Sequence, residues 1–231
     1  MVRPRREERI AGLDRRIKAA AWRQIERQGT GAVSLRGIAR AIGIAAPSIY
    51  NYYPTRDDLV TALAVDAFRS LADHQRRSIA EIPAVDAKER LAQLGLSYRD
   101  WAVHHPQRYQ LIFGTPIPDY VMPPETTMPP AAWALLPLME TLQSLSNEGR
   151  LRSERLPRRP DILKRLLTAW NSSMRSTGTS FDAEVLYLAY VIWTRVHGLV
   201  SLELGQQFPA FITQPSEIYR REIDSISIQY L

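Results

Sequence analysis

The sequence predicts an all-α protein, and three observations support this fold class. Apolar residues recur at intervals of three and four along most of the 231 residues, which is the spacing of one face of a helix. No alternating strand pattern, internal repeat or GxGxxG loop interrupts these stretches. Hydrophobic residues make up 45% of the chain and charged residues 23%, as in ordinary globular proteins, which argues against wholesale disorder.

The first predicted helix has one apolar stripe and ends at a glycine pair. The stripe consists of Ile10, Leu13, Ile17, Ala21 and Ile25. The helix ends at Gly29-Thr30-Gly31, because glycine weakens a helix. We expect this helix to cover the back of the two helices that follow, as the third member of a small bundle.

Residues 34–53 read as a helix, a tight turn and a second short helix. One face of the first helix carries Leu35, Ile38, Ala39 and Ile42. Gly43 supplies the backbone freedom that a tight interhelical turn needs. Pro47 suits the first turn of the next helix, where its missing N–H has no intrahelical partner. Ile49 and Tyr53 then point inward, so this segment is predicted to be a helix-turn-helix.

Residues 43–53, GIAAPSIYNYY, followed by PTRDDL at 54–59, resemble the helix-turn-helix of TetR-family transcriptional regulators. The family pattern is roughly G-[IV]-S-x-x-x-[LI]-Y-x-[HYW]-[FV], then a helix cap and a basic residue. The resemblance covers about residues 8–70. Ala45 departs from it, because the family has a Ser or Thr N-cap there, and losing that cap costs roughly 1 kcal/mol. The resemblance implies a DNA-binding domain over residues 1–55, ordered from about residue 8.

The charge distribution supports the same reading independently. Residues 1–60 contain 12 Lys and Arg against 6 Asp and Glu, whereas the remaining residues contain 18 of each sign. The whole formal net charge of +6 therefore lies in the N-terminal quarter. A segregated positive charge is typical of a nucleic-acid footprint, and a solvated basic helix face is the alternative.

The resemblance implies that nine residues contact DNA: Ser34, Arg36, Ala46, Pro47, Ser48, Tyr50, Asn51, Tyr52 and Arg56. The fork of Arg36 suits the O6 and N7 acceptors of guanine, although a phosphate contact or a free surface position remains open. Ala46 and Pro47 can only touch apolar features such as a thymine methyl, whereas Ser48 can bond to bases.

The other expected DNA contacts are mostly with the backbone. Tyr50 and Tyr52 would give their hydroxyls to phosphates, and Asn51 would contact a base or the backbone. Ser34 and Arg56 lie at helix starts, where N–H groups and positive side chains favour phosphate. Arg3, Arg5 and Arg6 precede the first helix and form either a minor-groove arm or a solvated terminus.

Further helices are predicted along residues 56–231. Thr55 and Asp58 resemble a capping box that starts a long helix to about Arg77. The next helix stops before His105-Pro106, and a short one follows. Residues 115–130 contain six prolines and are predicted to be a loop or lid. Later helices are expected at 133–149, 162–174, 182–207 and 217–229, and Asp182 can cap the third of these.

Residues 193–203, WTRVHGLVSLE, with WAVHHP at 101–106, resemble the WHG type of TetR C-terminal domain. This resemblance implies an all-helical ligand-binding and dimerisation domain over residues 56–231. The helix predicted at 182–207 is apolar almost all round and needs cover on every side. Part of that cover would come from a second subunit, which makes the protein a homodimer.

Large apolar side chains suggest a pocket for a small apolar or amphipathic effector in the C-terminal domain. The candidate pocket residues are Tyr98, Trp101, His104, Tyr109, Phe113, Trp133, Met139, Trp170, Asn171 and Met174. The alternative is that these residues form an ordinary core.

Nothing in the sequence indicates catalysis, a metal or a cofactor. The chain has no cysteine and no HExxH, GxSxG or P-loop spacing. His104 and His105 are adjacent on a helix and make a poor chelate, and His197 fits a packed, hydrogen-bonded position. The basic N-terminus lacks an apolar signal region, and the longest apolar run, 185–193, has nine residues, so no membrane span is expected.

These observations predict a cytoplasmic, nucleoid-associated transcriptional regulator. We expect a ligand-responsive repressor that binds a palindromic operator on double-stranded DNA as a dimer. Two alternatives remain: a DNA-bound structural or partner-recruiting protein without a small-molecule effector, and an all-α enzyme with an incidental basic helix pair.

Overall fold

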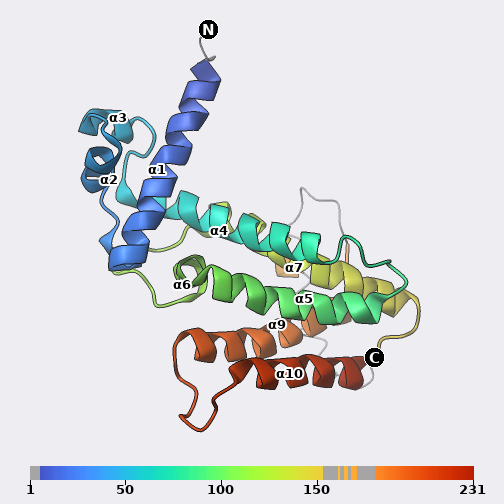
Figure 1. Cartoon of the computed structure of the whole chain (residues 1–231). Helices are drawn as coiled ribbons and strands as arrows, with labels where there is room; N and C mark the ends of the chain where they lie inside the picture. Colours follow the sequence, from blue (N-terminus) through green and yellow to red (C-terminus); the bar gives the residue numbers. More distant parts are fainter. Residues whose placement is uncertain (1–5, 153–160, 162–163, 166–167, 171–179) are drawn as a thin grey trace. The chain divides into compact units, whose positions relative to one another are not determined.

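The computed structural model describes residues 6–152, 161, 164–165, 168–170 and 180–231 (Figure 1). Ordered elements in this part of the chain are helical, and it contains no strand, which confirms the predicted all-α fold class. The chain divides into two compact units. Unit 1 consists of Met1–Ala67 and Gln107–Thr127, and unit 2 consists of Phe68–Pro106 and Met128–Leu231.

Unit 1 contains the predicted three-helix bundle. Its helices are α1 (Arg6–Gln28), a 3-10 turn at Thr30–Ala32, α2 (Leu35–Ile42), α3 (Ala46–Tyr50), the first part of α4 (Arg56–Ser78) and α6 (Pro106–Phe113). Figure 1 shows α2 and α3 side by side against α1, which packs on α2. Leu111 and Ile117 share one apolar core with Ile17, Ile38 and Ile49. The core of the N-terminal bundle is therefore completed by residues from the middle of the chain.

The predicted interhelical turn is present at Gly43. This residue ends α2 in the left-handed conformation, with φ 70° and ψ 39°. The N–H of Ile44 then donates to the carbonyl of Ala39 at 3.0 Å and closes the end of α2. A residue with a Cβ is strained at this φ, so glycine suits the sharp turn into α3.

The predicted start of α1 needs adjustment. Arg6 is the first residue of α1, so it does not precede the helix as expected, and Arg3 and Arg5 lie outside the described residues. Ile10 belongs to the predicted apolar stripe but is 46% exposed. The buried part of the stripe begins farther along, and Ile17 is fully buried.

The loop or lid predicted at residues 115–130 is wrong for its second half. Helix α7 runs from Pro124 to Asn147 and contains Pro129, Pro130 and Pro137. Pro124 is the first residue of the helix, where no backbone N–H is needed. Pro129 and Pro130 leave the carbonyls of Glu125 and Thr126 without their usual donors, but both of these residues are exposed and water can satisfy them.

Unit 2 contains the second part of α4, α5 (Ala87–His104), the larger part of α7, α9 (Ala183–Leu204) and α10 (Pro215–Tyr230). Figure 1 shows α9 and α10 running side by side, and both pack against α5. Asp182 occupies the predicted N-cap position of α9, but its carboxylate accepts a bond from Gln143 instead of capping the helix. Residues 162–163, 166–167 and 171–174 of the predicted 162–174 helix lie outside the described residues.

Among the described helices, α9 alone is long and apolar enough to cross a membrane by length and composition. Seven of its side chains are buried in unit 2: Val185, Leu186, Leu188, Ala189, Ile192, Val196 and Val200. Its charged residues Arg195 and Glu203 form ion pairs with α10 and α5, respectively. A helix with these contacts is a core helix of a globular unit, and we interpret α9 in that way.

Candidate nucleic-acid interface

The predicted recognition helix α3 presents a short, mostly open surface. Ala45 stands at its N-cap with no side-chain hydrogen bond, as the sequence predicts. Pro47 and Asn51 are exposed, and Tyr50 is 38% exposed. Ala46 and Ser48 are half-buried, while Ile49 is fully buried beneath them. The exposed ridge can therefore meet a partner while Ile49 anchors the helix to the core.

The two tyrosines at the end of the recognition segment differ in burial. Tyr52 is half-buried and packs against the unit 1 core, so only part of its ring is open to a partner. Tyr53 is 7% exposed, which confirms its predicted core position. Its hydroxyl donates to Asp14 on α1 at 2.5 Å.

Helix α2 carries the predicted base-reading side chain. Arg36 is exposed, and no hydrogen bond or ion pair within the described residues holds its guanidinium. Ser34 is the N-cap of α2, where its hydroxyl accepts from the N–H of Gly37 at 3.2 Å. Arg40, one turn after Arg36, is also exposed and adds positive charge to this helix.

Arg56 is already engaged within unit 1. Its guanidinium donates to the carbonyl of Gly31 at 3.1 Å and lies 3.6 Å from the carboxylate of Asp57. The predicted capping box beside it is confirmed, because Thr55 and Asp58 exchange hydrogen bonds through backbone and side chain. A phosphate at Arg56 would share this side chain with Gly31 and Asp57.

Sequence reasoning missed two residues that hold α2 in place. Gln24 accepts a hydrogen bond from the N–H of Ser34 at 3.0 Å. Arg16 donates to the carbonyl of Ile42 at 2.8 Å. Both lie on α1, ten and twenty-six positions from their partners, so no local spacing could have revealed them.

The predicted effector residues are distributed over both units. Tyr98, Trp101, Met139 and Trp170 are buried in unit 2, where Trp133 is half-buried; Tyr109 is buried and Phe113 half-buried in unit 1. His104 is exposed, and its Nδ1 lies 2.8 Å from the carbonyl oxygen of Asp100. Asn171 and Met174 lie outside the described residues.

Several of these residues have polar or aromatic partners. Trp101 Nε1 donates to Ser70 Oγ at 3.1 Å. The guanidinium of Arg69 lies 5.6 Å from the centre of the Trp133 ring, a cation–π geometry. The ring centroids of Trp170 and Phe181 are 6.0 Å apart in an edge-to-face arrangement.

His197 on α9 is a packed histidine, as the sequence predicts. Tyr98 Oη lies 2.9 Å from its Nδ1, and the ring of Trp193 stacks on it with centroids 4.8 Å apart. Burial lowers the pKa of His197 below its ordinary value, because desolvation disfavours the charged imidazolium. Within the residues that the structure describes, no group of three or more His, Asp or Glu side chains could hold a metal ion.

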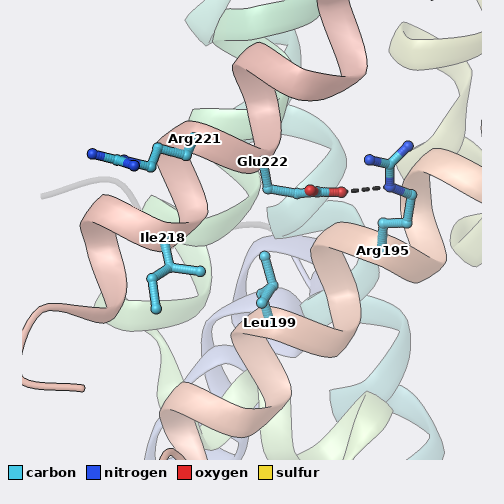
Figure 2. Close-up of a pocket in the computed structure, with 5 residues that line it drawn as sticks. All are labelled: Arg195, Leu199, Ile218, Arg221 and Glu222. Atoms are coloured by element: carbon cyan, nitrogen blue, oxygen red, sulfur yellow. Dashed lines mark hydrogen bonds and ion pairs between the residues drawn. The ribbon is translucent and has the colours of Figure 1, made fainter. Parts of the chain in front are cut away.

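A hollow of about 450 Å³ lies between α9 and α10 (Figure 2). Its lining consists of Arg195, Leu199, Ile218, Arg221 and Glu222. Figure 2 shows Glu222 and Arg195 joined across the two helices, with Leu199 and Ile218 below them. None of the predicted effector residues lines this hollow. An apolar floor with a charged edge fits a protein partner better than a small ligand.

Residues 17–63 match the family described as bacterial regulatory proteins, tetR family. Residues 91–226 match the tetracyclin repressor-like C-terminal domain. The chain is 28% identical over 209 residues to the HTH-type transcriptional regulators Rv1816 of Mycobacterium tuberculosis and Mb1846 of Mycobacterium bovis, covering 90% of this chain and 87% of each relative.

Solved structures agree with these sequence matches. The crystal structure of regulatory protein SCO4313 is 30% identical, with a TM-score of 0.73 over 96% of this chain and 98% of that one. A protein of unknown function from Rhodococcus sp. RHA1 is 19% identical and has a TM-score of 0.70, covering 94% and 95% of the two chains. The second likeness concerns the fold alone.

Proposed function

Because this chain belongs to the TetR family of transcriptional regulators, we propose that it is a ligand-responsive repressor that binds a palindromic operator as a homodimer. The observation that supports this most is the open ridge of α3. Pro47, Tyr50 and Asn51 are exposed on a helix that Ile49 anchors in the core. This ridge belongs to the quarter of the chain that carries the whole net positive charge.

Arg36 and the exposed ridge of α3 would make different contacts with DNA. The exposed guanidinium of Arg36 reads a guanine edge, and Ser48 and Asn51 add base or backbone contacts. The hydroxyl of Tyr50 positions the module on a phosphate. Ser34 already uses its hydroxyl as a helix cap, so it would meet phosphate mainly by presenting the N-terminus of α2.

The hollow between α9 and α10 is our candidate dimer surface. Leu199 and Ile218 form its apolar floor, and Leu202 on α9 is 37% exposed. A second copy of the same two helices would cover this surface by a twofold arrangement. Leu199→Asp should shift sedimentation from dimer to monomer, whereas Val121→Asp, at an 86% exposed position of unit 1, should not.

An effector in unit 2 would act by favouring one of two dimer geometries. It must bind them with different affinity, since equal affinity shifts nothing. Within unit 1, α6 and the segment after it contact both α1 and α4: Arg108 lies 5.3 Å from the Trp22 ring, and Tyr120 and Thr61 share a 2.9 Å hydrogen bond. A shift of α6 would therefore reach the DNA-binding bundle directly.

A second function is favoured by the burial of the predicted pocket residues. Trp101 and Met139 are each 0% exposed, which suits a filled core. A filled core would make the chain a DNA-bound structural or partner-recruiting protein without a small-molecule effector. Release of operator DNA in a screen of apolar and amphipathic compounds would exclude this second function.

The decisive experiment compares binding of the purified protein to DNA from its own upstream intergenic region with binding to scrambled DNA. A salt series should weaken both complexes, because phosphate contacts release counterions. We expect the upstream DNA to bind about a thousandfold more tightly or better. Equal, salt-sensitive binding to every natural fragment offered, including genome-wide fragments, would contradict sequence-specific regulation.

A further inference from the structure

The hydroxyl of Tyr53 makes a hydrogen bond that burial of its ring does not require. The ring of Tyr53 is buried in the unit 1 cluster three residues after α3 ends, and packing needs only the ring. The hydroxyl nevertheless donates to Asp14 Oδ1 on α1 at 2.5 Å. Asp14 and Tyr53 are thirty-nine positions apart, so this bond joins the end of the recognition segment to a distant helix.

Asp14 also belongs to a chain of ion pairs that reaches α4. Lys18, one turn further along α1, lies 3.6 Å from Asp14 and 2.8 Å from Asp66. The three charged side chains are partly buried, with exposed fractions between 21% and 32%. We call Tyr53, Asp14, Lys18 and Asp66 the Tyr53 network; it connects the end of α3 with α1 and α4.

The network supplies a directional constraint that the apolar contacts of α3 lack. Ile49 fills the core, but apolar contact is nearly indifferent to small rotations of a five-residue helix. A hydrogen bond to a carboxylate has a preferred length and angle, and a partly desolvated one is stronger than its exposed counterpart. Only a fixed rotation brings Pro47 and Ser48 to the same base pairs, and Tyr50 to the same phosphate, each time.

Tyr53 is a hydrogen-bond donor at neutral pH, as any tyrosine is, because the ordinary pKa of a phenol is about 10. Desolvation, followed by the hydrogen bond to Asp14, raises the pKa of Tyr53 far above this ordinary value. The bond to Asp14 is therefore kept at alkaline pH as well.

We propose that Tyr53 is a positioning residue for DNA recognition, whose hydroxyl bond to Asp14 sets the orientation of α3 on α1 and α4. This inference rests on the proposed DNA-binding function. Tyr53 itself touches no DNA in this proposal, because its ring and hydroxyl both face the interior of unit 1. Removing the hydroxyl should thus reduce discrimination between operator and other DNA more than it reduces general affinity.

The test compares Tyr53→Phe with Tyr120→Phe. Tyr120 is a matched control, because it loses a hydroxyl bond within the same unit, to Thr61 on α4 at 2.9 Å, and that bond does not involve residues 43–53. The ratio of scrambled-DNA to operator dissociation constants should fall about 5- to 20-fold in Tyr53→Phe, and by less than twofold in Tyr120→Phe. Affinity for scrambled DNA and its salt slope should stay unchanged in both.

Two Asp14 variants connect the effect to the network. In Asp14→Asn the side chain still accepts from Tyr53, so most of the discrimination should be kept. Asp14→Ala should lose it, and adding Tyr53→Phe to Asp14→Ala should cause no further loss. A lower unfolding temperature in Tyr53→Phe with an unchanged dissociation-constant ratio would show a purely structural role and overturn the proposal.

Amide hydrogen exchange in the free protein tests the inference without DNA. Exchange at Ile49 and Tyr50 should accelerate at least fivefold in Tyr53→Phe relative to α1, and it should not change in Tyr120→Phe. Unchanged exchange would overturn the positioning role even if operator binding were intact. Faster exchange in a protein without any operator preference would instead support the positioning role and contradict the proposed function.

Discussion

Units 1 and 2 use the same secondary structure but present their important side chains in opposite ways. In unit 1 the candidate DNA contacts Arg36, Pro47 and Tyr50 point outward from a small core. In unit 2 the aromatic residues proposed for effector binding are mostly inside, and the indole N–H of Trp101 donates to Ser70. DNA recognition by unit 1 depends on side chains that are already exposed. Binding of an effector by unit 2 would require its buried side chains to become accessible.

This contrast explains why local patterns were informative in one unit and ambiguous in the other. A helix-turn-helix needs a glycine turn, caps and a few exposed polar groups at fixed spacing, and each of these has a local signature. A buried aromatic side chain has the same signature whether it fills a core or lines a pocket. The two units should therefore respond differently to substitution, in stability for unit 2 and in DNA affinity for unit 1.

The largest expected effect is on stability in unit 2. Trp101→Ala should lower the free energy of unfolding by about 3–5 kcal/mol, because the fully buried indole leaves a cavity and its hydrogen bond to Ser70 is lost. Urea denaturation followed by circular dichroism measures this loss. Trp133→Ala is the control and should cost clearly less, since Trp133 is half-buried. Equal costs would mean that unit 2 does not have the tight core described above.

The next effect is on DNA affinity in unit 1. Arg36→Ala should weaken operator binding by about 1–3 kcal/mol, roughly 5- to 150-fold, while thermal stability and dimerisation stay unchanged. Fluorescence anisotropy with a labelled operator gives the affinity. Arg76→Ala removes the same charge from an exposed site in unit 2 and should have little effect. A dimer that dissociates in Arg36→Ala would contradict the assignment of this residue to the DNA surface.

A smaller effect is expected at the uncapped start of α3. Ala45→Ser should raise the free energy of unfolding by about 0.5–1 kcal/mol, because the N-cap backbone is extended and no side chain caps the helix. Ala45→Val has no oxygen and serves as the control in thermal denaturation. If both variants had the same stability, the cap would be satisfied in another way.

The smallest effect concerns pH and His197. Burial lowers its folded pKa below the unfolded value near 6.5, so between these two pKa values the unfolded chain binds more protons. Stability from this residue is therefore present above pH 6.5, falls as pH drops toward the folded pKa, and stays constant below it. Unfolding at pH 7 and pH 5 should differ less in His197→Gln than in the unaltered protein. If the variant and the unaltered protein had the same pH dependence of unfolding, groups other than His197 would be responsible for it.

Sequence patterns alone determined the all-α class, the Gly43 turn, the Thr55–Asp58 cap and the inward positions of Ile49 and Tyr53. Each of these is decided by interactions within one or two helical turns, which spacing and residue type encode directly. The family resemblance extended this to the function of the N-terminal module and is confirmed by the sequence matches.

Only the tertiary structure decided which distant residues complete these elements. Leu111 and Ile117 enter the N-terminal core, Gln24 holds the start of α2, and Asp14 receives the Tyr53 hydroxyl. The physical reason is common to all of these: their energies come from contacts between segments far apart in sequence, and spacing along one helix carries no record of the partner.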